Sequence, residues 1–224
     1  MDAETGKRAA GEAAAALVED GMRVGLGTGT TARWFVLALV ERAHAGLRVA
    51  CVATSEATVR LAEELGISLE PLDRRGIDIA VDGADAVDAD LRLIKGGGGA
   101  LVREKIVAAA ARSFVVVVDD SKVCSALPGS VPVELVPFGV DRTLALLEST
   151  GGAYTLRTVN GAALLSDNSN LIADGHYESL DDPEGLAARL DAIPGLVGHG
   201  LFLGMTDLLL VGHPDGGVER RSPR

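Results

Sequence analysis

Basic residues are scarce in this sequence, and their scarcity excludes two classes of partner. Lys and Arg number 21 against 32 Asp and Glu, which gives a formal net charge of −11 over 224 residues. Nucleic acids and anionic membranes also carry negative charge, so a chain this acidic is poorly suited to bind either. We therefore expect no nucleic-acid partner and no membrane partner.

Cysteine and long apolar runs are also rare. Cys51 and Cys124 are the two cysteines, and no C-x-x-C motif occurs. This usage indicates no disulfide framework and is typical of a reducing compartment. No apolar stretch approaches the roughly 20 residues of a membrane span, and acidic residues interrupt the first 20 residues, unlike in a secretory signal. We expect a cytoplasmic protein.

Aromatic residues make up 3% of the chain although hydrophobic residues make up 47%. The core must therefore consist of Ala, Val, Leu and Ile, which is typical of parallel α/β sheets. The apolar patterns predict alternating strands and helices in the first part of the chain. The expected strands are 23–26, 48–54, 67–72, 77–83 and 113–120, and the expected helices are 5–20, 31–43, 55–66 and 100–112.

The pattern changes after Val131, where strand-like segments follow one another with two interleaved helices, about 140–149 and 184–192. The fold class predicted is α/β: a Rossmann-like parallel-sheet domain with βαβ units, plus a smaller α+β domain with an antiparallel sheet. We expect residues 1–130 and 200–224 to form the Rossmann-like domain and residues 131–199 the smaller one. The last residues, ERRSPR, are expected to form a frayed polar tail.

The glycine-rich segment 25–31, between a strand and a helix, is the first candidate site. Glycine allows close approach of the backbone, and a helix N-terminus offers free N–H groups to an anion. Thr28, Gly29, Thr30 and Thr31 thus form a candidate phosphate cradle. A P-loop lysine is missing, and Thr30 stands where a dinucleotide fingerprint needs glycine. The alternative is a plain tight turn.

Two acidic and glycine-rich strips follow. Asp82, Gly83, Ala84 and Asp85 follow the apolar strand residues IDIAV (77–81), at the end where open α/β sheets bind ligands. Their carboxylates suit metal ligation or acid–base work on a sugar, and the alternative is an Asx turn. No histidine lies nearby, which weakens the metal hypothesis.

The second strip, 95–99, contains Lys95, Gly96, Gly97 and Gly98, and Glu104 follows in the next helix. Lys95 could reach an anion, while Glu104 could point back to the loop or be an ordinary surface charge.

Lysines supply the remaining candidates. Lys122 follows the buried strand 113–120 and could help to neutralise a phosphate. Lys7, beside the first helix, is a weaker candidate.

Taken together, these loops resemble the type A ribose-5-phosphate isomerase family, with matching motifs in the same order over nearly the whole chain. The residues that carry the resemblance are GLGTGTTA (25–32), TSEATVRLAEELGI (54–67), DGADAVD (82–88), IKGGGGALVREKI (94–106), DDSK (119–122), VPVEL (131–135), DNSNLIAD (167–174), IPGLVGHGLF (193–202) and HPDG (213–216).

The resemblance implies interconversion of D-ribose 5-phosphate and D-ribulose 5-phosphate without metal or cofactor. It makes Glu104 the base that carries a proton between C2 and C1, and Lys95 with the glycine-loop amides the oxyanion stabilisers. It assigns ring opening to Asp82 and places Asp85 in the substrate-binding strip.

The resemblance further places the segment 28–31, Lys122 and Lys7 among substrate-binding positions, the first for the phosphate. It also suggests a homodimer or homotetramer, in the non-oxidative pentose phosphate pathway.

Three departures from the family pattern occur at Ala86, Gly99 and Ser169, and none removes a candidate catalytic group. Two other functions stay open. One is a related sugar-phosphate deaminase-isomerase or lactonase. The other is a non-catalytic sugar-phosphate-sensing domain, for which the single N-terminal helix is too short to supply a helix-turn-helix.

Overall fold

The computed structural model describes residues 3–223, which divide into two compact units. Unit 1 contains 3–84, 103–123 and 204–223, and unit 2 contains 85–102 and 124–203. Three segments differ from the expected boundaries, because 85–102, 124–130 and 200–203 group with unit 2, and the longest of them is 85–102. The reason is strand pairing: β4 (Ala86–Val87) pairs with β5 (Leu93–Ile94), which pairs with β13 (Leu201–Phe202).

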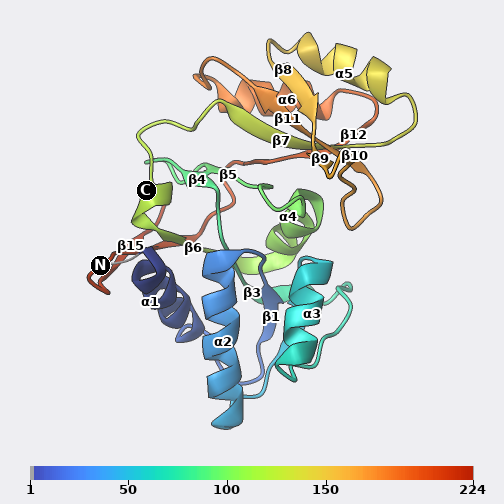
Figure 1. Ribbon diagram of the computed structural model, residues 1–224. Coiled ribbons are helices and arrows are strands. Elements are labelled where there is room, and N and C mark those ends of the chain that lie inside the picture. The colour runs from blue at the N-terminus through green and yellow to red at the C-terminus, as the bar shows by residue number, and fades with distance from the viewer. Residues whose placement is uncertain (1–2, 224) are drawn as a thin grey trace. The chain divides into compact units, whose positions relative to one another are not determined.

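Unit 1 is built on a six-stranded sheet in the order β15-β14-β6-β3-β1-β2, in which only the β14–β15 pair is antiparallel. Figure 1 labels β1, β3, β6 and β15 of this sheet. The strands are β1 (Arg23–Leu26), β2 (Ala50–Ala53), β3 (Ile77–Asp82), β6 (Ala111–Asp119), β14 (Leu208–Gly212) and β15 (Val218–Arg221). The predicted Rossmann-like parallel sheet is thus confirmed. As expected from its apolar run, β6 is buried continuously from Phe114 to Asp119.

The helices of unit 1 follow the expected order. They are α1 (Ala3–Ala15), α2 (Thr30–His44), α3 (Glu56–Glu64) and α4 (Leu101–Ala110), whose first two residues belong to unit 2, with the short 3-10 helix η1 (Asp120–Lys122) after β6. Gly66, beyond α3, has φ 73°, a conformation that favours glycine at a helix end. None of these helices, nor any other among the described residues, is long and apolar enough to cross a membrane.

Two local predictions in unit 1 are wrong. Residues 67–72 form no strand and make one isolated bridge, between Leu69 and Cys51. Residues 219–221 of the supposed polar tail belong to β15, whose backbone pairs with β14 from Val218 to Arg221. Charged side chains are tolerated there because β15 is an edge strand with an exposed face.

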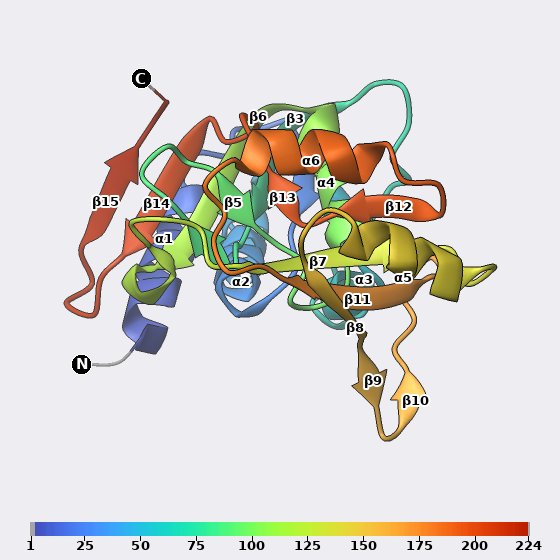
Figure 2. The same cartoon turned by 90° about the horizontal axis from the view of Figure 1, so that it is seen from above.

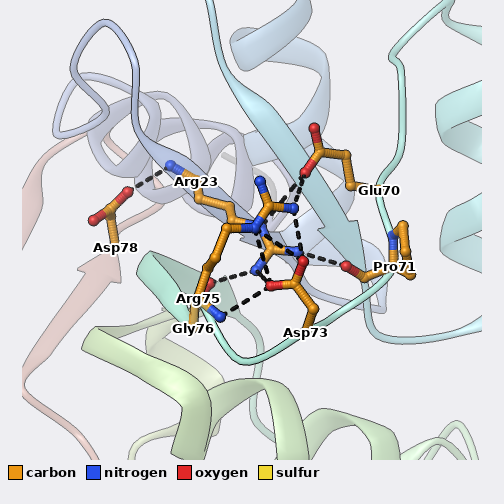
Figure 3. A network of polar contacts seen from close by, with 7 residues as sticks. All are labelled: Arg23, Glu70, Pro71, Asp73, Arg75, Gly76 and Asp78. Carbon is orange, nitrogen blue, oxygen red and sulfur yellow. Dashed lines mark hydrogen bonds and ion pairs between the residues drawn. The ribbon is translucent and has the colours of Figure 1, made fainter.

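Arg23 explains why the segment after α3 is ordered without being a strand (Figure 3). Its side chain is 9% exposed, and its guanidinium donates to the carbonyl oxygens of Pro71, at 2.5 Å, and Gly76, at 2.7 Å. The same group donates to Asp73 Oδ1 at 3.0 Å. The bond to Pro71 satisfies a carbonyl group of the segment 67–72 that a strand would pair with a neighbour, and the bonds to Asp73 and Gly76 hold the turn that follows.

Unit 2 contains the predicted antiparallel sheet, in the order β12-β7-β11-β8. Its elements are β7 (Ser130–Leu135), β8 (Ala153–Leu156), β11 (Leu171–His176), β12 (Leu196–His199), α5 (Val140–Glu148) and α6 (Pro183–Asp191), besides the strands β4, β5 and β13. A separate hairpin of β9 (Thr158–Val159) and β10 (Ala162–Ala163) projects from this sheet (Figure 2). The apolar core of this unit is centred on Val131, Val133 and Leu135 of β7.

Candidate functional site

The carboxyl ends of five parallel strands meet at one edge of the unit 1 sheet. The order β14-β6-β3-β1-β2 and the parallel register bring the loops after these strands to that edge. Segments distant in sequence therefore come to the same edge: 27–31 after β1, 54–55 after β2, Asp82 at the end of β3 with 83–84 after it, and 120–122 after β6. This is the edge at which open α/β sheets bind ligands.

Asp82 joins two of these loops. Its Oδ1 atom accepts hydrogen bonds from the backbone N–H of Thr28, at 2.9 Å, and of Gly83, at 2.8 Å. The side chain is buried, and a Cβ built on Gly27 would lie 2.3 Å from Oδ1. The carboxylate thus fixes the turn after β1, and glycine is required at position 27 because Asp82 occupies the space of a side chain.

Four hydroxyl groups form a cluster under the same turn, which we call the hydroxyl cluster: Thr28, Thr54, Ser55 and Thr58. Thr28 Oγ1 lies 2.8 Å from Thr54 Oγ1, 2.7 Å from Ser55 Oγ and 3.0 Å from Thr58 Oγ1. Thr54 donates to the Leu26 carbonyl and Thr58 to the Gly27 carbonyl, each at 3.0 Å. The Thr28 hydroxyl, expected to face a phosphate, is therefore hydrogen-bonded within the hydroxyl cluster and helps to hold the turn after β1.

Sequence reasoning assigned no role to Thr54, Ser55 and Thr58. Ser55 is the N-cap of α3 and accepts from the Thr58 N–H at 3.0 Å. A Ser immediately after a strand and before a helix is a readable N-cap signal. The sequence could not reveal the contact of Ser55 with Thr28, because this contact depends on the pairing of β1 with β2.

The N-terminus of α2 suits an anion. Gly29, its N-cap, has φ 111° and makes no side-chain cap bond, and the first turn contains no acidic residue. Gly29 and Thr30 are exposed, whereas Thr31 is buried. Uncapped N–H groups at the start of this 15-residue helix can bind a phosphate, with the helix dipole adding to the attraction.

The two lysine candidates of unit 1 lie near the carboxyl edge. Lys122 ends η1, directly after β6, where the Asp119 carboxylate accepts from the Ser121 N–H at 3.1 Å. Lys7 lies on α1 and pairs with Glu4 at 3.6 Å. Helix α1 is held close to the end of β14, because a Cβ on Gly6 would lie 2.6 Å from the Gly212 carbonyl oxygen. Both lysines are half-buried.

Glu104 lies in the first turn of α4 and is 6% exposed. The alternative that it is an ordinary surface charge is therefore wrong. Its neighbour Arg103 does match that description, since it forms an ion pair with Glu56 at 2.8 Å and is a third exposed. A buried carboxylate in a helix that follows a glycine loop is a candidate general base.

In unit 2, Lys95 begins the segment that we call the glycine loop, residues 95–99. The side chain is 2% exposed, and Nζ lies 5.5 Å from the centre of the Phe202 ring. Its backbone N–H donates to the Gly200 carbonyl at 2.9 Å. This distance is within the range of a cation–π contact, so Lys95 is a candidate source of positive charge in an acidic chain.

The glycine loop is also tied to Asp85, whose Oδ2 atom accepts from the Gly97 N–H at 2.7 Å. Asp85 N–H in turn donates to the Ile94 carbonyl at 2.8 Å. Unit 2 thus brings Asp85 together with Gly97, while Gly98 is exposed with open space around its Cα. Asp88 is buried and binds Arg92 at 2.7 Å, so it stabilises its own turn.

Sequence reasoning also missed Arg157, which contacts this loop, and Asp174, which pairs with Arg157. Arg157 donates to the carbonyl oxygens of Gly96 and Gly97 and forms a bidentate ion pair with Asp174. Asp174 is the last residue of the motif DNSNLIAD (167–174), but nothing in the local sequence indicates its pairing with Arg157.

Among the residues that the structure describes, no group of three or more His, Cys, Asp or Glu side chains could hold a metal ion. Unit 1 also has an apolar hollow of about 540 Å³ beside α3 and α4, lined by Val59, Leu69, Ile106 and others. It contains none of the candidate site residues, and its apolar lining is a poor match for a sugar phosphate.

Known proteins resemble this chain over nearly its whole length. The model of the family Ribose 5-phosphate isomerase A (phosphoriboisomerase A) matches residues 50–216. Ribose-5-phosphate isomerase A of Roseiflexus castenholzii is 48% identical, over 100% of this chain and 98% of its own. The protein of the same name from Agrobacterium fabrum is 46% identical, over 96% and 97%.

Solved structures agree with these relatives. A D-ribose-5-phosphate isomerase in complex with phospho-erythronic acid is 36% identical with a TM-score of 0.94, covering 99% of this chain and 100% of that one. A ribose 5-phosphate isomerase from Plasmodium falciparum is 34% identical with a TM-score of 0.93, covering 98% of each chain.

Proposed function

The chain belongs to the ribose 5-phosphate isomerase A family and is an isomerase, and we propose that it interconverts D-ribose 5-phosphate and D-ribulose 5-phosphate through an enediol. The observation that carries the proposal is the buried carboxylate of Glu104, which lies within the residues that the family model matches, in the first turn of the helix after the glycine loop. Neither the deaminase and lactonase alternatives nor the sensing domain gains support from these relatives.

The proposed reaction needs one proton carrier and no oxidant. The Glu104 carboxylate removes the proton from C2 of the open aldose, and the electron pair of the broken C–H bond forms the C1–C2 double bond as O1 gains negative charge. A proton then moves from O2 to O1, and Glu104 returns its proton to C1, leaving the ketose. The C2 proton has moved to C1, and the atoms balance.

The negative charge on the sugar oxygen needs donors close to it during this step. We assign that role to the Lys95 ammonium and to N–H groups of the glycine loop, because fixed donors stabilise an oxyanion without reorganising. Burial of Lys95 strengthens its field. We assign ring opening to Asp82, which would accept the proton of the O1 hydroxyl and deliver it to the ring oxygen O4 as the C1–O4 bond breaks and C1 becomes the aldehyde carbon.

The phosphate group of the substrate is assigned to the N-terminus of α2, with Gly29, Thr30 and Thr31, and to Lys122 with Lys7 nearby. The uncapped helix end supports this assignment. A relative is known with phospho-erythronic acid, an acid that also carries a phosphate.

The test is a coupled assay of purified protein with ribose 5-phosphate that follows ketose formation, with and without EDTA. We expect turnover that EDTA leaves unchanged. The absence of turnover would contradict the isomerase proposal, and turnover lost only with EDTA would contradict the metal-free mechanism.

We further propose a homodimer or homotetramer that acts in the cytoplasm, in the non-oxidative pentose phosphate pathway. Exposed apolar side chains of unit 2, Phe138 at 92% and Leu165 at 55%, support self-association because water is a poor environment for them. Light scattering measures the assembly directly, and a mass equal to that of one chain would contradict it.

A further inference from the structure

The Arg157 guanidinium makes two sets of hydrogen bonds, one in an ion pair with a carboxylate and one to carbonyl groups of the glycine loop. It follows directly after β8, and its Nε and Nη2 atoms donate to the two carboxylate oxygens of Asp174 on β11, each at 2.6 Å. Its Nη1 atom donates to the carbonyl oxygens of Gly96, at 2.7 Å, and Gly97, at 3.0 Å. The two side chains are 17% and 23% exposed, so water screens these bonds only in part.

These bonds determine where the loop's N–H groups point. In a trans peptide the C=O and N–H groups point in opposite directions, and no cis bond occurs in the described residues. Binding the Gly97 carbonyl therefore turns the Gly98 N–H away from Arg157. The Gly97 N–H is already bound to Asp85, and the Gly99 N–H donates to the Gly96 carbonyl at 3.0 Å.

Of the three glycines 97, 98 and 99, only Gly98 has an N–H group without a hydrogen-bond partner among residues 3–223. It is also exposed, with no atom within 4 Å of the position of a Cβ. A donor that is fixed in direction and accessible can bind an oxyanion without reorganising.

We propose that Arg157, oriented by Asp174, is a positioning residue that holds the glycine loop so that the Gly98 N–H donates to the oxyanion of the enediolate. This inference rests on the proposed function of the loop. Consecutive glycines have the largest backbone entropy to lose on ordering. Arg157 restrains this segment from outside, and Asp174 fixes the plane of the guanidinium.

The experiment compares Arg157→Met, which removes all four bonds, with Arg157→Lys. The Lys side chain keeps the charge, but its single ammonium cannot reproduce the planar fork that spans Asp174 and two carbonyls. Arg189→Met, at an exposed position on α6, is the matched control. The double exchange of Arg157→Asp with Asp174→Arg restores the ion pair without restoring the bonds to the loop.

We expect kcat to fall about 10- to 100-fold in both Arg157 variants, with KM for ribose 5-phosphate changed less than about threefold. The double exchange should recover the unfolding temperature but not kcat, and Arg189→Met should match the wild type. Unchanged kcat in Arg157→Met would overturn the proposal. A double exchange that recovers both the unfolding temperature and kcat would also overturn it, because the ion pair would then only stabilise the sheet that contains β8 and β11.

Hydrogen exchange of the peptide covering residues 95–100 gives a readout that needs no activity. The Gly97 and Gly99 amides should exchange about tenfold faster in Arg157→Met than in the wild type, with the control unchanged. Unchanged exchange overturns the restraint on the loop. Faster exchange in a protein whose wild type has no isomerase activity would instead contradict the proposed function and leave the restraint standing.

Discussion

A Cβ atom at Gly27 would lie 2.3 Å from Oδ1 of Asp82, so the turn after β1 has room for glycine alone. That carboxylate oxygen also accepts from the backbone N–H of Thr28 and of Gly83. One buried aspartate therefore sets the shape of the loop that leads to the N-terminus of α2. Any side chain at position 27 must displace either the turn or the carboxylate.

Gly27→Ala is accordingly expected to lower the free energy of unfolding by about 1–3 kcal/mol, the usual cost of overpacking, and to reduce kcat/KM. Thermal or urea unfolding and the isomerase assay measure the two effects. Gly83→Ala is the control for stability, because its Cβ would lie 3.8 Å from the nearest atom. Equal stability of the two variants would show that the Gly27 turn adapts.

Glu104→Gln keeps the shape of the side chain and removes the base. We expect kcat to fall about 10²- to 10⁴-fold, the usual contribution of a general base, while the unfolding temperature stays close to that of the wild type. Glu64→Gln, exposed at the end of α3, is the control. Near-normal kcat in Glu104→Gln would show that another group carries the proton.

The hydroxyl cluster predicts a cost for Thr58→Val. This change keeps the volume of the side chain but removes the group that donates to the Gly27 carbonyl and contacts Thr28 and Ser55. We expect a loss of about 1–3 kcal/mol for the buried polar groups left unpaired, and a higher KM for the sugar phosphate. Thr58→Ser, which retains the hydroxyl, should recover most of both. If it does not, the methyl group rather than the hydroxyl matters.

Lys122 is predicted to matter for binding because a chain of net charge −11 must bind an anionic substrate against its own mean field. Lys122→Met should raise KM for ribose 5-phosphate about tenfold, comparable to a charged hydrogen bond, with kcat less affected. Lys122→Arg should restore binding in part, and Arg60→Met, exposed on α3, is the control. An unchanged KM would argue against a phosphate site at the end of β6.

Low pH should lower the stability of unit 1 because it protonates the Asp73 carboxylate. Its hydrogen bonds with Arg75, and the nearby charge of Arg23, lower the pKa of this carboxyl from 3.8 to about 2. Since the pKa is depressed in the folded state, the stabilisation is present above about pH 4 and is lost as the pH falls towards 2. Asp73→Asn should therefore destabilise the protein at pH 7 and flatten this part of the pH profile.

Unfolding by urea at pH 7, 4 and 2 measures the Asp73 effect, with Asp141→Asn at an exposed position as the control. A wild-type profile that Asp73→Asn leaves unchanged would show that other carboxylates account for the acid sensitivity. High salt should reduce the difference, because exposed ion pairs are screened.

The sequence by itself determined the α/β class, the alternation of β1, β2, β3 and β6 with the helices α1 to α4, and the edge at which Asp82 and Lys122 lie. The reason is that these features follow from local information: apolar periodicity, helix-stopping glycines, and the rule that loops after parallel strands share one edge. The roles given to Glu104, Lys95 and Asp85 came from family resemblance, and they stay predictions.

Only the tertiary structure decided which side chains support the loops. Thr28 meets Thr54 and Thr58 across 26 and 30 residues of chain, and Arg157 meets Gly96 across 61. No local periodicity encodes such contacts, because they arise when strand pairing brings distant segments together. The same holds for the segment 67–72, whose apolar pattern predicted a strand. The Arg23 guanidinium, from another strand, bound the carbonyl of Pro71 instead.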